Sequence, residues 1–138
     1  PATLFVASFV GSMNVFEHLP VGLGGEVTIG AAMRALPALV GRAEITLAMR
    51  PEDVILAGRG EKAGDAISIE GAVDKVTYAG REAFYRLTGA DGLQILAHVS
   101  RPDQGRLASV GERLFMALPL ARLHAFDPAD GRRVELRP

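Results

Sequence analysis

The stretch Ala43-Glu44-Ile45-Thr46-Leu47-Ala48-Met49, followed directly by Arg50-Pro51-Glu52-Asp53, decides how the rest of the chain is interpreted. Its larger apolar residues Ile45, Leu47 and Met49 recur with a period of two, which is typical of a strand with one buried face. The proline then stiffens the chain, because its ring fixes φ and removes a hydrogen-bond donor. The two carboxylates after it suit a turn. The stretch therefore predicts a strand that ends in a rigid corner, where one sub-sheet stops and the next starts.

The sequence on both sides of this stretch is also β-like. In the decisive strand, Glu44, Thr46 and Ala48 fall on the face opposite the apolar one, and Ile67 and Ile69 alternate with polar neighbours in the same way. Glycine, proline and aspartate interrupt the β-type segments every ten or so residues, which predicts a small barrel or sandwich. The expected strands after residue 70 are 71–78, 83–88 and 93–100, linked as hairpins, and then 113–118, with a tight final turn at Asp130-Gly131.

The length fits one domain, or two small β modules that share one core, and the sequence divides into four parts. Residues 1–11 carry Leu4, Phe5, Phe9 and Val10 at helical spacing and end on Gly11, which predicts one short N-terminal helix. A first β part over 12–57, a glycine-rich and charged loop over 58–66 and a second β part over 67–138 follow. Residues 31–40 have near-helical spacing that a proline breaks, so a half-turn, a loop and an irregular strand all remain open there.

Composition excludes several classes of protein. Among 138 residues, 15 basic and 16 acidic side chains give a formal charge of -1, without the clustered positive stripe of a nucleic-acid groove. No apolar stretch approaches the ~20 residues of a membrane-spanning helix. The chain has no cysteine, which excludes disulfides and fits a reducing cytosol. Because it starts at Pro1 with no leader pattern, we expect a fragment whose parent continues toward the amino side.

Catalytic and ligand-binding motifs are not found. The Gly-Lys-Ser/Thr of a phosphate-binding loop is missing, and Gly22-Leu23-Gly24-Gly25 is interpreted as a hairpin turn. The histidines His18, His98 and His124 stand too far apart for a metal motif, and the serines lack a nucleophile context. We therefore expect no catalytic, cofactor-binding or metal-binding residue in this chain.

Three motifs in order resemble the TOBE domain, the carboxy-terminal regulatory region of the ATP-binding subunits of bacterial ABC importers. They are Phe5-Val6-Ala7-Ser8-Phe9-Val10-Gly11-Ser12-Met13-Asn14, the strand-end Arg50-Pro51-Glu52 and the closing Phe126-Asp127 with Gly131. The resemblance covers nearly the whole chain. Its matching residues, for which we expect architectural roles, are Gly11, Asn14, Arg50, Pro51, Glu52, Phe126, Asp127 and Gly131.

The resemblance implies a mainly β, OB-fold-like barrel or sandwich that regulates and dimerises an ABC-type ATPase. ATP and Mg²⁺ would bind in a preceding domain of the parent, which would be cytoplasmic, peripheral to the inner membrane. Its partners would be a second copy of the subunit and the transporter's membrane subunits, with no nucleic acid. An alternative is a barrel that senses an oxyanion or other small ligand. Residues 15–40 resemble the spermidine, iron(III) and phosphonate importers more than sugar importers, but the transported solute cannot be inferred.

Overall fold

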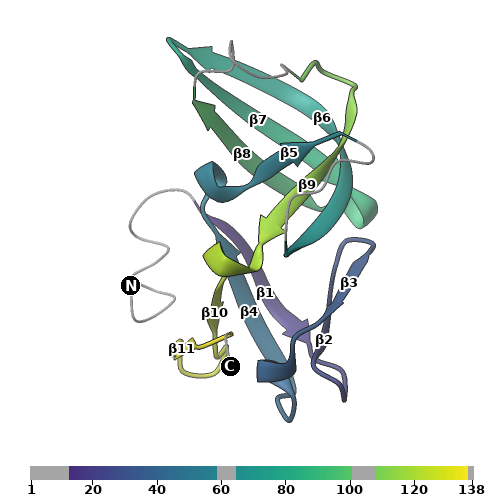
Figure 1. Ribbon diagram of the computed structural model, residues 1–138, viewed down its shortest axis with the longest axis vertical. Helices are drawn as coiled ribbons and strands as arrows, with labels where there is room; N and C mark the ends of the chain where they lie inside the picture. Colours follow the sequence, from purple (N-terminus) through teal and green to yellow (C-terminus); the bar gives the residue numbers. More distant parts are fainter. Residues whose placement is uncertain (1–12, 59–64, 101–107, 137–138) are drawn as a thin grey trace.

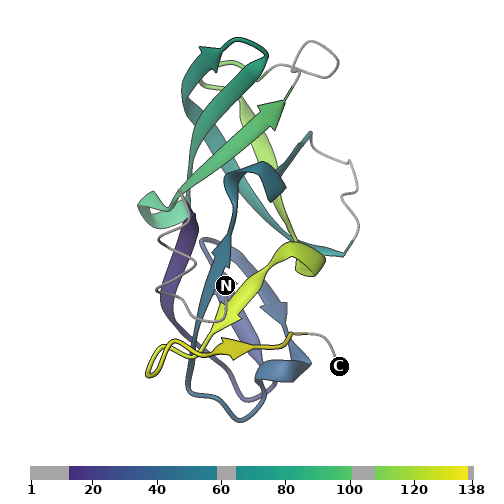
Figure 2. The same cartoon turned by 90° about the vertical axis from the view of Figure 1, so that its left-hand side faces the viewer.

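The computed structural model describes residues 13–58, 65–100 and 108–136, and their regular structure consists of strands and single-turn 3₁₀ helices. The fold is mainly β and OB-fold-like, as the sequence predicts. The helix expected over residues 1–11, with Gly11 at its end, lies outside the described residues. Two sheets stand end to end, one above the other in Figure 1, and Figure 2 shows the same arrangement from the side.

The first sheet has four strands in the order β1-β4-β10-β11. All its neighbouring strands are antiparallel, and a bulge interrupts the β1–β4 register between Phe16 and Leu19. A separate hairpin, β2-β3, packs beside this sheet, and residues 31–40 prove to be a short strand followed by one 3₁₀ turn. The bounds are β1 Asn14–Pro20, β2 Glu26–Ile29, β3 Ala32–Ala35, η1 Pro37–Leu39, β4 Glu44–Met49, β10 His124–Phe126 and β11 Arg133–Val134.

The second sheet has five strands in the order β5-β9-β6-β7-β8. The hairpin-linked meander is confirmed as β6-β7-β8, and the strand expected over 113–118 is confirmed as β9. The long strand β6 pairs with both β7 and β9. The bounds are β5 Ile55–Ala57, β6 Ala66–Ala79, β7 Glu82–Gly89, η3 Ala90–Gly92, β8 Gln94–Ser100, β9 Arg113–Pro119 and η5 Leu120–Arg122.

The chain crosses twice between the sheets, each time through one 3₁₀ turn. The first crossing is η2 (Pro51–Asp53), between β4 and β5, and the second is η5, between β9 and β10. Pro51 is the first residue of η2, and Pro119, the last residue of β9, directly precedes η5. Because of the two crossings, β5 belongs to the second sheet and β10 and β11 belong to the first, so the sheets do not coincide with the sequence ranges 12–57 and 67–138.

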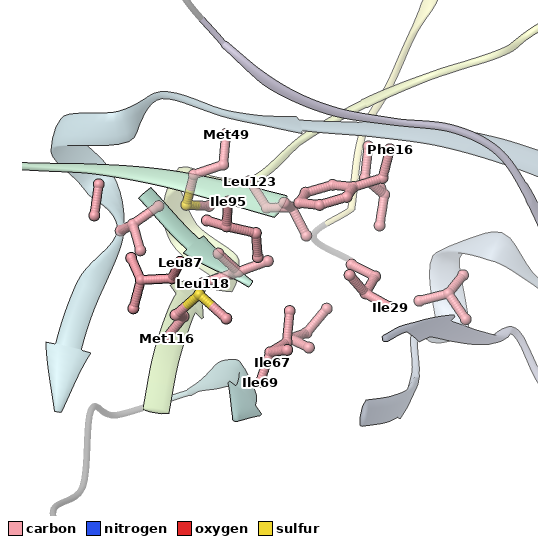
Figure 3. Close-up of a cluster of buried hydrophobic side chains, with 14 of the residues drawn as sticks. Phe16, Ile29, Met49, Ile67, Ile69, Leu87, Ile95, Met116, Leu118 and Leu123 are labelled. Atoms are coloured by element: carbon pink, nitrogen blue, oxygen red, sulfur yellow. The ribbon is translucent and has the colours of Figure 1, made fainter. Parts of the chain in front are cut away.

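One continuous core fills the space between the sheets and the β2-β3 hairpin. Figure 3 shows labelled members of this core from both sheets, with Phe16 and Met49 from the first sheet and Ile95, Leu87 and Leu118 from the second. The alternation of β6 is as predicted. The strand β4 differs from the prediction, because Thr46 and Ala48 are as buried as its apolar side, at 1% and 0% exposure. On this second face Ala48 packs with Phe126 of β10, and Met13 and Val15 pack against them.

Candidate functional site

The corner at Arg50-Pro51-Glu52 joins the two sheets and is held by its backbone. The Asp53 amide donates to the Arg50 carbonyl oxygen at 3.0 Å, and the Val54 amide donates to the Pro51 carbonyl oxygen at 3.3 Å. The turn η2 packs against β8 of the second sheet. Within the part of the chain that the structure describes, the side chains of Arg50 and Glu52 make no hydrogen bond or ion pair. The corner is therefore a stiff joint whose two charged side chains remain available to solvent.

Asn14 fastens β1 of the first sheet to β8, an edge strand of the second. Its Nδ2 donates to the Leu96 carbonyl oxygen at 2.9 Å, and the Leu96 amide donates to its Oδ1 at 2.7 Å. The side-chain amide thus occupies the place that a neighbouring strand's peptide group would take. Asn14 is 6% exposed, so both bonds are shielded from water. No local sequence pattern indicates this role, and only the family motif pointed to the residue.

The closing corner Phe126-Asp127, with Gly131, is a hydrogen-bonded turn, as predicted. Phe126 is fully buried. The Asp127 Oδ1 accepts a bond from the Ala129 amide at 2.8 Å, while its Oδ2 accepts one from Arg42 at 3.1 Å. Gly131 has a φ of 72°, where glycine avoids the clash of a Cβ atom, and its amide donates to the Asp127 carbonyl oxygen at 2.8 Å. Asp127 therefore ties the last turn to the start of β4.

A cavity of roughly 500 Å³ opens beside this corner. His18 borders this cavity and has a φ of 51° at the β1 bulge. The Nδ1 atom of His18 lies 3.3 Å from Glu44 Oε2. A non-glycine residue in this conformation stores strain and re-aims its side chain. The Arg42–Asp127 ion pair also lines the cavity. The lining residues are His18, Gly41, Arg42, Ala43, Glu44, Asp127, Pro128 and Ala129.

His124 lies on the same sheet as the closing corner, next to Phe126. Its ring stacks on that of Phe126 with centroids 6.5 Å apart, and its Nδ1 is buried without a hydrogen-bond partner. Burial lowers the pKa of His124, and the positive charges of Arg133 and Arg50 lower it further, while Asp53 acts in the opposite direction. The ring therefore favours its neutral form.

The outer face of the meander carries two carboxylate networks. Glu82 accepts a hydrogen bond from the Ser100 hydroxyl at 2.8 Å and contacts His98 Nε2 at 2.7 Å. Both contacts lower the pKa of Glu82, and the Ser100 bond has the larger effect. His98 stacks on Phe84 with centroids 4.4 Å apart, so it lies on the polar face as expected. This histidine–carboxylate–serine contact has the wrong order for a nucleophile triad, because the serine and the histidine both bind the carboxylate and not each other.

The second network is centred on Asp74. Its carboxylate accepts a hydrogen bond from the Thr88 hydroxyl, and Arg86 Nε lies 2.5 Å from its Oδ1. The threonine and then the arginine lower the pKa of Asp74. Both partners stand on β7, opposite the register shift of β6 between Val73 and Lys75. The network therefore stabilises an irregular part of the β6–β7 pairing.

Over residues 13–58, 65–100 and 108–136, no three His, Asp or Glu side chains gather closely enough to hold a metal ion. No helix in that part of the chain has the length and hydropathy needed to span a bilayer. Five arginines of the described residues form ion pairs with carboxylates of this chain. They are Arg34, Arg42, Arg86, Arg113 and Arg132. What the geometry of the described residues does provide is a set of joints between the two sheets.

These features define the class of OB-fold-like β modules in which two sheets share one core. The family model described as "TOBE domain" matches residues 47–126, from the middle of β4 through β10. The chain belongs to the TOBE domain family. The matched span contains both crossings between the sheets and ends on Phe126.

The chain is also similar to curated proteins over almost its whole length. It is 36% identical over 139 residues to the sn-glycerol-3-phosphate import ATP-binding protein UgpC of Chromohalobacter salexigens, covering 99% of this chain and 36% of the relative. A protein of the same name from Chromobacterium violaceum is 35% identical, covering 98% of this chain and 36% of the relative. The chain therefore spans about 36% of the length of these relatives. Their names mention sn-glycerol-3-phosphate, and not the spermidine, iron(III) or phosphonate suggested by residues 15–40.

Among solved structures, the chain resembles the cytoplasmic molybdate-binding protein ModG, in a crystal form with molybdate bound. The TM-score is 0.60 over 83% of this chain and 94% of ModG, with 14% sequence identity. At this identity the similarity concerns the fold.

Proposed function

We propose that this chain is the carboxy-terminal regulatory and dimerisation domain of the ATP-binding subunit of a bacterial ABC importer. The observation that carries the proposal is the match of 99% of this chain to about a third of an import ATP-binding protein, together with its TOBE fold. In this proposal ATP and Mg²⁺ bind in another domain of the parent protein, which is the ATPase. The transporter's membrane subunits are then reached through the parent on the cytoplasmic side of the membrane.

The rigidity of the module supports a tethering role. The two sheets share one core, and they are joined by the proline corner η2 and by the buried Asn14 amide. A module that does not flex between its sheets can keep two ATPase domains paired at one end while their nucleotide-binding faces open and close. We therefore place the role of the chain in holding and positioning a second copy.

Exposed apolar side chains in two parts of the chain are available for such a contact. Phe84 and Leu96 are 43% and 40% exposed on the outer face of the meander, and they are diagonal neighbours because Phe84 pairs with His98 and Arg86 pairs with Leu96. Outside the meander, Leu23, which precedes β2, and Met33, which lies on β3, are 99% and 70% exposed. Adjacent exposed apolar side chains are typical of interaction surfaces.

Sedimentation of the 138-residue chain over a range of concentrations tests the proposal. We expect a concentration-dependent dimer that sulfate, phosphate and molybdate leave unchanged. The paired variants Phe84→Ser with Leu96→Ser and Leu23→Ser with Met33→Ser serve as controls for each other, since only one pair should dissociate the dimer. A chain that stays monomeric at every concentration, both alone and fused to the ATPase domain of a relative, would contradict the dimerisation role.

A second candidate function is oxyanion sensing, which the structural likeness to molybdate-bound ModG favours. The best placed cations are Arg50 and Arg133, whose charges both act on His124 and which make no ion pair within the described residues. If the chain senses an oxyanion, adding that oxyanion should raise its melting temperature. The effect should be lost in the double variant Arg50→Gln/Arg133→Gln and kept in the control double variant Arg81→Gln/Arg122→Gln. Equal responses of the two double variants would exclude this site.

A further inference from the structure

The cavity beside the closing corner is lined by charged side chains of both signs. Arg42 and Glu44 come from either side of Ala43 at the start of β4, Asp127 comes from the closing corner, and His18 comes from the β1 bulge. The volume of roughly 500 Å³ lies within the range of about 300–1,000 Å³ that small-ligand pockets occupy. Three segments that are far apart in the sequence therefore border one hollow that is large enough for a small molecule.

Each charged group in the lining has one partner and keeps spare hydrogen-bonding capacity. Arg42 Nη1 lies 3.1 Å from Asp127 Oδ2, whereas Nε and Nη2 of Arg42 bind no other group of the described residues. Glu44 Oε2 lies 3.3 Å from His18 Nδ1, and among the same residues Glu44 Oε1 has no hydrogen-bond partner. The side chains of Arg42 and Glu44 are 37% and 50% exposed. A ligand can therefore reach a charged donor on one and a charged acceptor on the other.

The backbone around the cavity holds two uncommon conformations. His18, with its φ of 51°, is strained, and strain of this kind clusters at ligand-binding sites. Gly41 has a φ of 92°, which glycine adopts without a Cβ clash, so no side chain enters the cavity from this position. Pro128 and Ala129 add an apolar wall. The lining thus combines a charged part with an apolar part.

The mixture of charges selects the class of ligand. A ligand with only a negative charge would bind Arg42 but would lie against two carboxylates, those of Glu44 and Asp127. A ligand with only a positive charge would bind Glu44 but would leave the spare nitrogens of Arg42 without an acceptor. A small zwitterion satisfies both, because its carboxylate accepts from the guanidinium and its ammonium donates to the carboxylate of Glu44.

The spacing of the two charged residues agrees with this class. Arg42 and Glu44 are two positions apart, so their Cα atoms lie at most about 7 Å from each other. In an α-amino acid the ammonium nitrogen and the carboxylate carbon are about 2.5 Å apart, as set by the two bonds through Cα. Two side chains that border one cavity from such close positions can therefore hold both ends of one ligand. The wall formed by Pro128 and Ala129 suits an aliphatic ligand side chain.

We propose that this cavity binds an α-amino acid, with the ligand carboxylate on Arg42 and the ligand ammonium on Glu44. His18 positions Glu44 through the contact of its Nδ1. The inference goes beyond the proposed function and does not depend on it, because every residue of the site belongs to one copy of the chain. The site also differs from the one considered for an oxyanion, since Arg50 and Arg133 do not line the cavity.

NMR titration of the isotope-labelled chain tests the class of ligand. The probes are L-leucine, glycine, and two leucine analogues that each lack one charge, isocaproate without the ammonium and isoamylamine without the carboxylate. We expect millimolar binding of L-leucine, because half-exposed charges are screened by solvent, with amide shifts confined to residues 41–44 and 127–129 and the neighbourhood of His18. Each analogue should bind at least about tenfold more weakly, since each loses a charge-assisted hydrogen bond.

The same titration states what would overturn the proposal. Glycine carries both charges without a side chain, so an absence of shifts with both glycine and L-leucine would refute the site. Equal affinity of L-leucine and either analogue would refute the zwitterion as its ligand. These comparisons use the unaltered chain, so they decide the proposal even where a variant fails to fold.

Substitution of the two charged residues assigns their partners on the ligand. Arg42→Gln should weaken L-leucine at least about tenfold and leave isoamylamine unchanged, because isoamylamine has no carboxylate. Glu44→Gln should weaken L-leucine similarly and make isocaproate bind no more weakly. The control Arg86→Gln breaks an arginine–carboxylate pair on the second sheet and should leave all three affinities unchanged. Equal weakening of all three ligands by Arg42→Gln or by Glu44→Gln would refute the assigned partners.

Discussion

Replacing Asn14 by aspartate tests whether one buried amide joins the two sheets. In the wild type the Asn14 side chain both donates to and accepts from Leu96, at 2.9 Å and 2.7 Å. An ionised carboxylate keeps the acceptor but puts an oxygen opposite the Leu96 carbonyl. One lost bond contributes about 0.5–1.5 kcal/mol, and an unsatisfied buried carbonyl about 1–3 kcal/mol. We therefore expect Asn14→Asp to lower the free energy of unfolding by about 2–4 kcal/mol at neutral pH.

The pH dependence of this loss identifies its cause. A protonated carboxyl can donate to Leu96 as the amide does, so the folded state raises the pKa of the introduced aspartate above its unfolded value of about 3.9. A raised pKa means that the stabilising contact is present below about pH 4 and is lost as the pH rises through the folded-state pKa. The deficit relative to the wild type should therefore shrink as the solution is acidified from pH 7.

Urea denaturation followed by far-UV circular dichroism, at pH 7 and near pH 4, measures both effects. Asn14→Ala has no titrating group at this site, so its deficit should stay constant between the two pH values. Gln94→Glu makes the same amide-to-carboxylate exchange at an exposed position of β8 and should cost little. A loss below about 0.5 kcal/mol for Asn14→Asp at neutral pH, within the range of an ordinary surface substitution, would refute the reasoning.

Three further predictions concern a turn and two titrating groups. A Cβ on Gly25 (φ +82°) would lie 2.3 Å from the Leu36 carbonyl oxygen, whereas Gly80 has open space. In urea denaturation, Gly25→Ala should therefore lose well more stability than the about 1–2 kcal/mol expected for Gly80→Ala. Equal losses in the two variants would count against this clash. Because burial lowers the pKa of His124, the unfolded state takes up a proton first as the pH falls from about 7 to 5. Over this range the wild type should lose stability relative to His124→Gln. Parallel curves of unfolding free energy against pH for the two proteins would contradict this. The pKa of Asp74 is lowered, so its contribution to stability is present above about pH 4 and is lost as the pH falls through the folded-state pKa. Asp74→Asn should therefore show a flatter dependence of stability on pH in acid than the wild type. An unchanged slope would exclude a stabilising role of the Asp74 hydrogen bonds.

Local periodicity predicted much of the fold correctly. The meander and β9 have clear alternation and turn residues on both sides, so both their type and their order could be predicted. The corner at Pro51 was expected to separate sub-sheets, and the structure has its first crossing there. These features depend on neighbours a few residues apart, which a single sequence displays.

Features that depend on distant neighbours were not predicted. Thr46 and Ala48 look like solvent-facing positions, but both are buried, and Phe126 of the short strand β10, which returns from the far end of the chain, packs with Ala48 on that face. The contact between Asn14 and Leu96 joins residues 82 positions apart, and an asparagine carries no local signal for such a bond. The cavity at His18 depends on a bulge in β1 that no sequence pattern in this strand indicates.

The order of the strands also has a consequence for synthesis of the chain. The strands β6 to β9 follow one another along the chain and pair among themselves, so they can associate as soon as they leave the ribosome. The strand β4 is made earlier, yet its flank toward β10 stays open until His124–Phe126 emerge. An open strand edge invites pairing with other chains. We therefore expect nascent chains stalled between β9 and β10 to aggregate through β4, even though the second sheet has already formed.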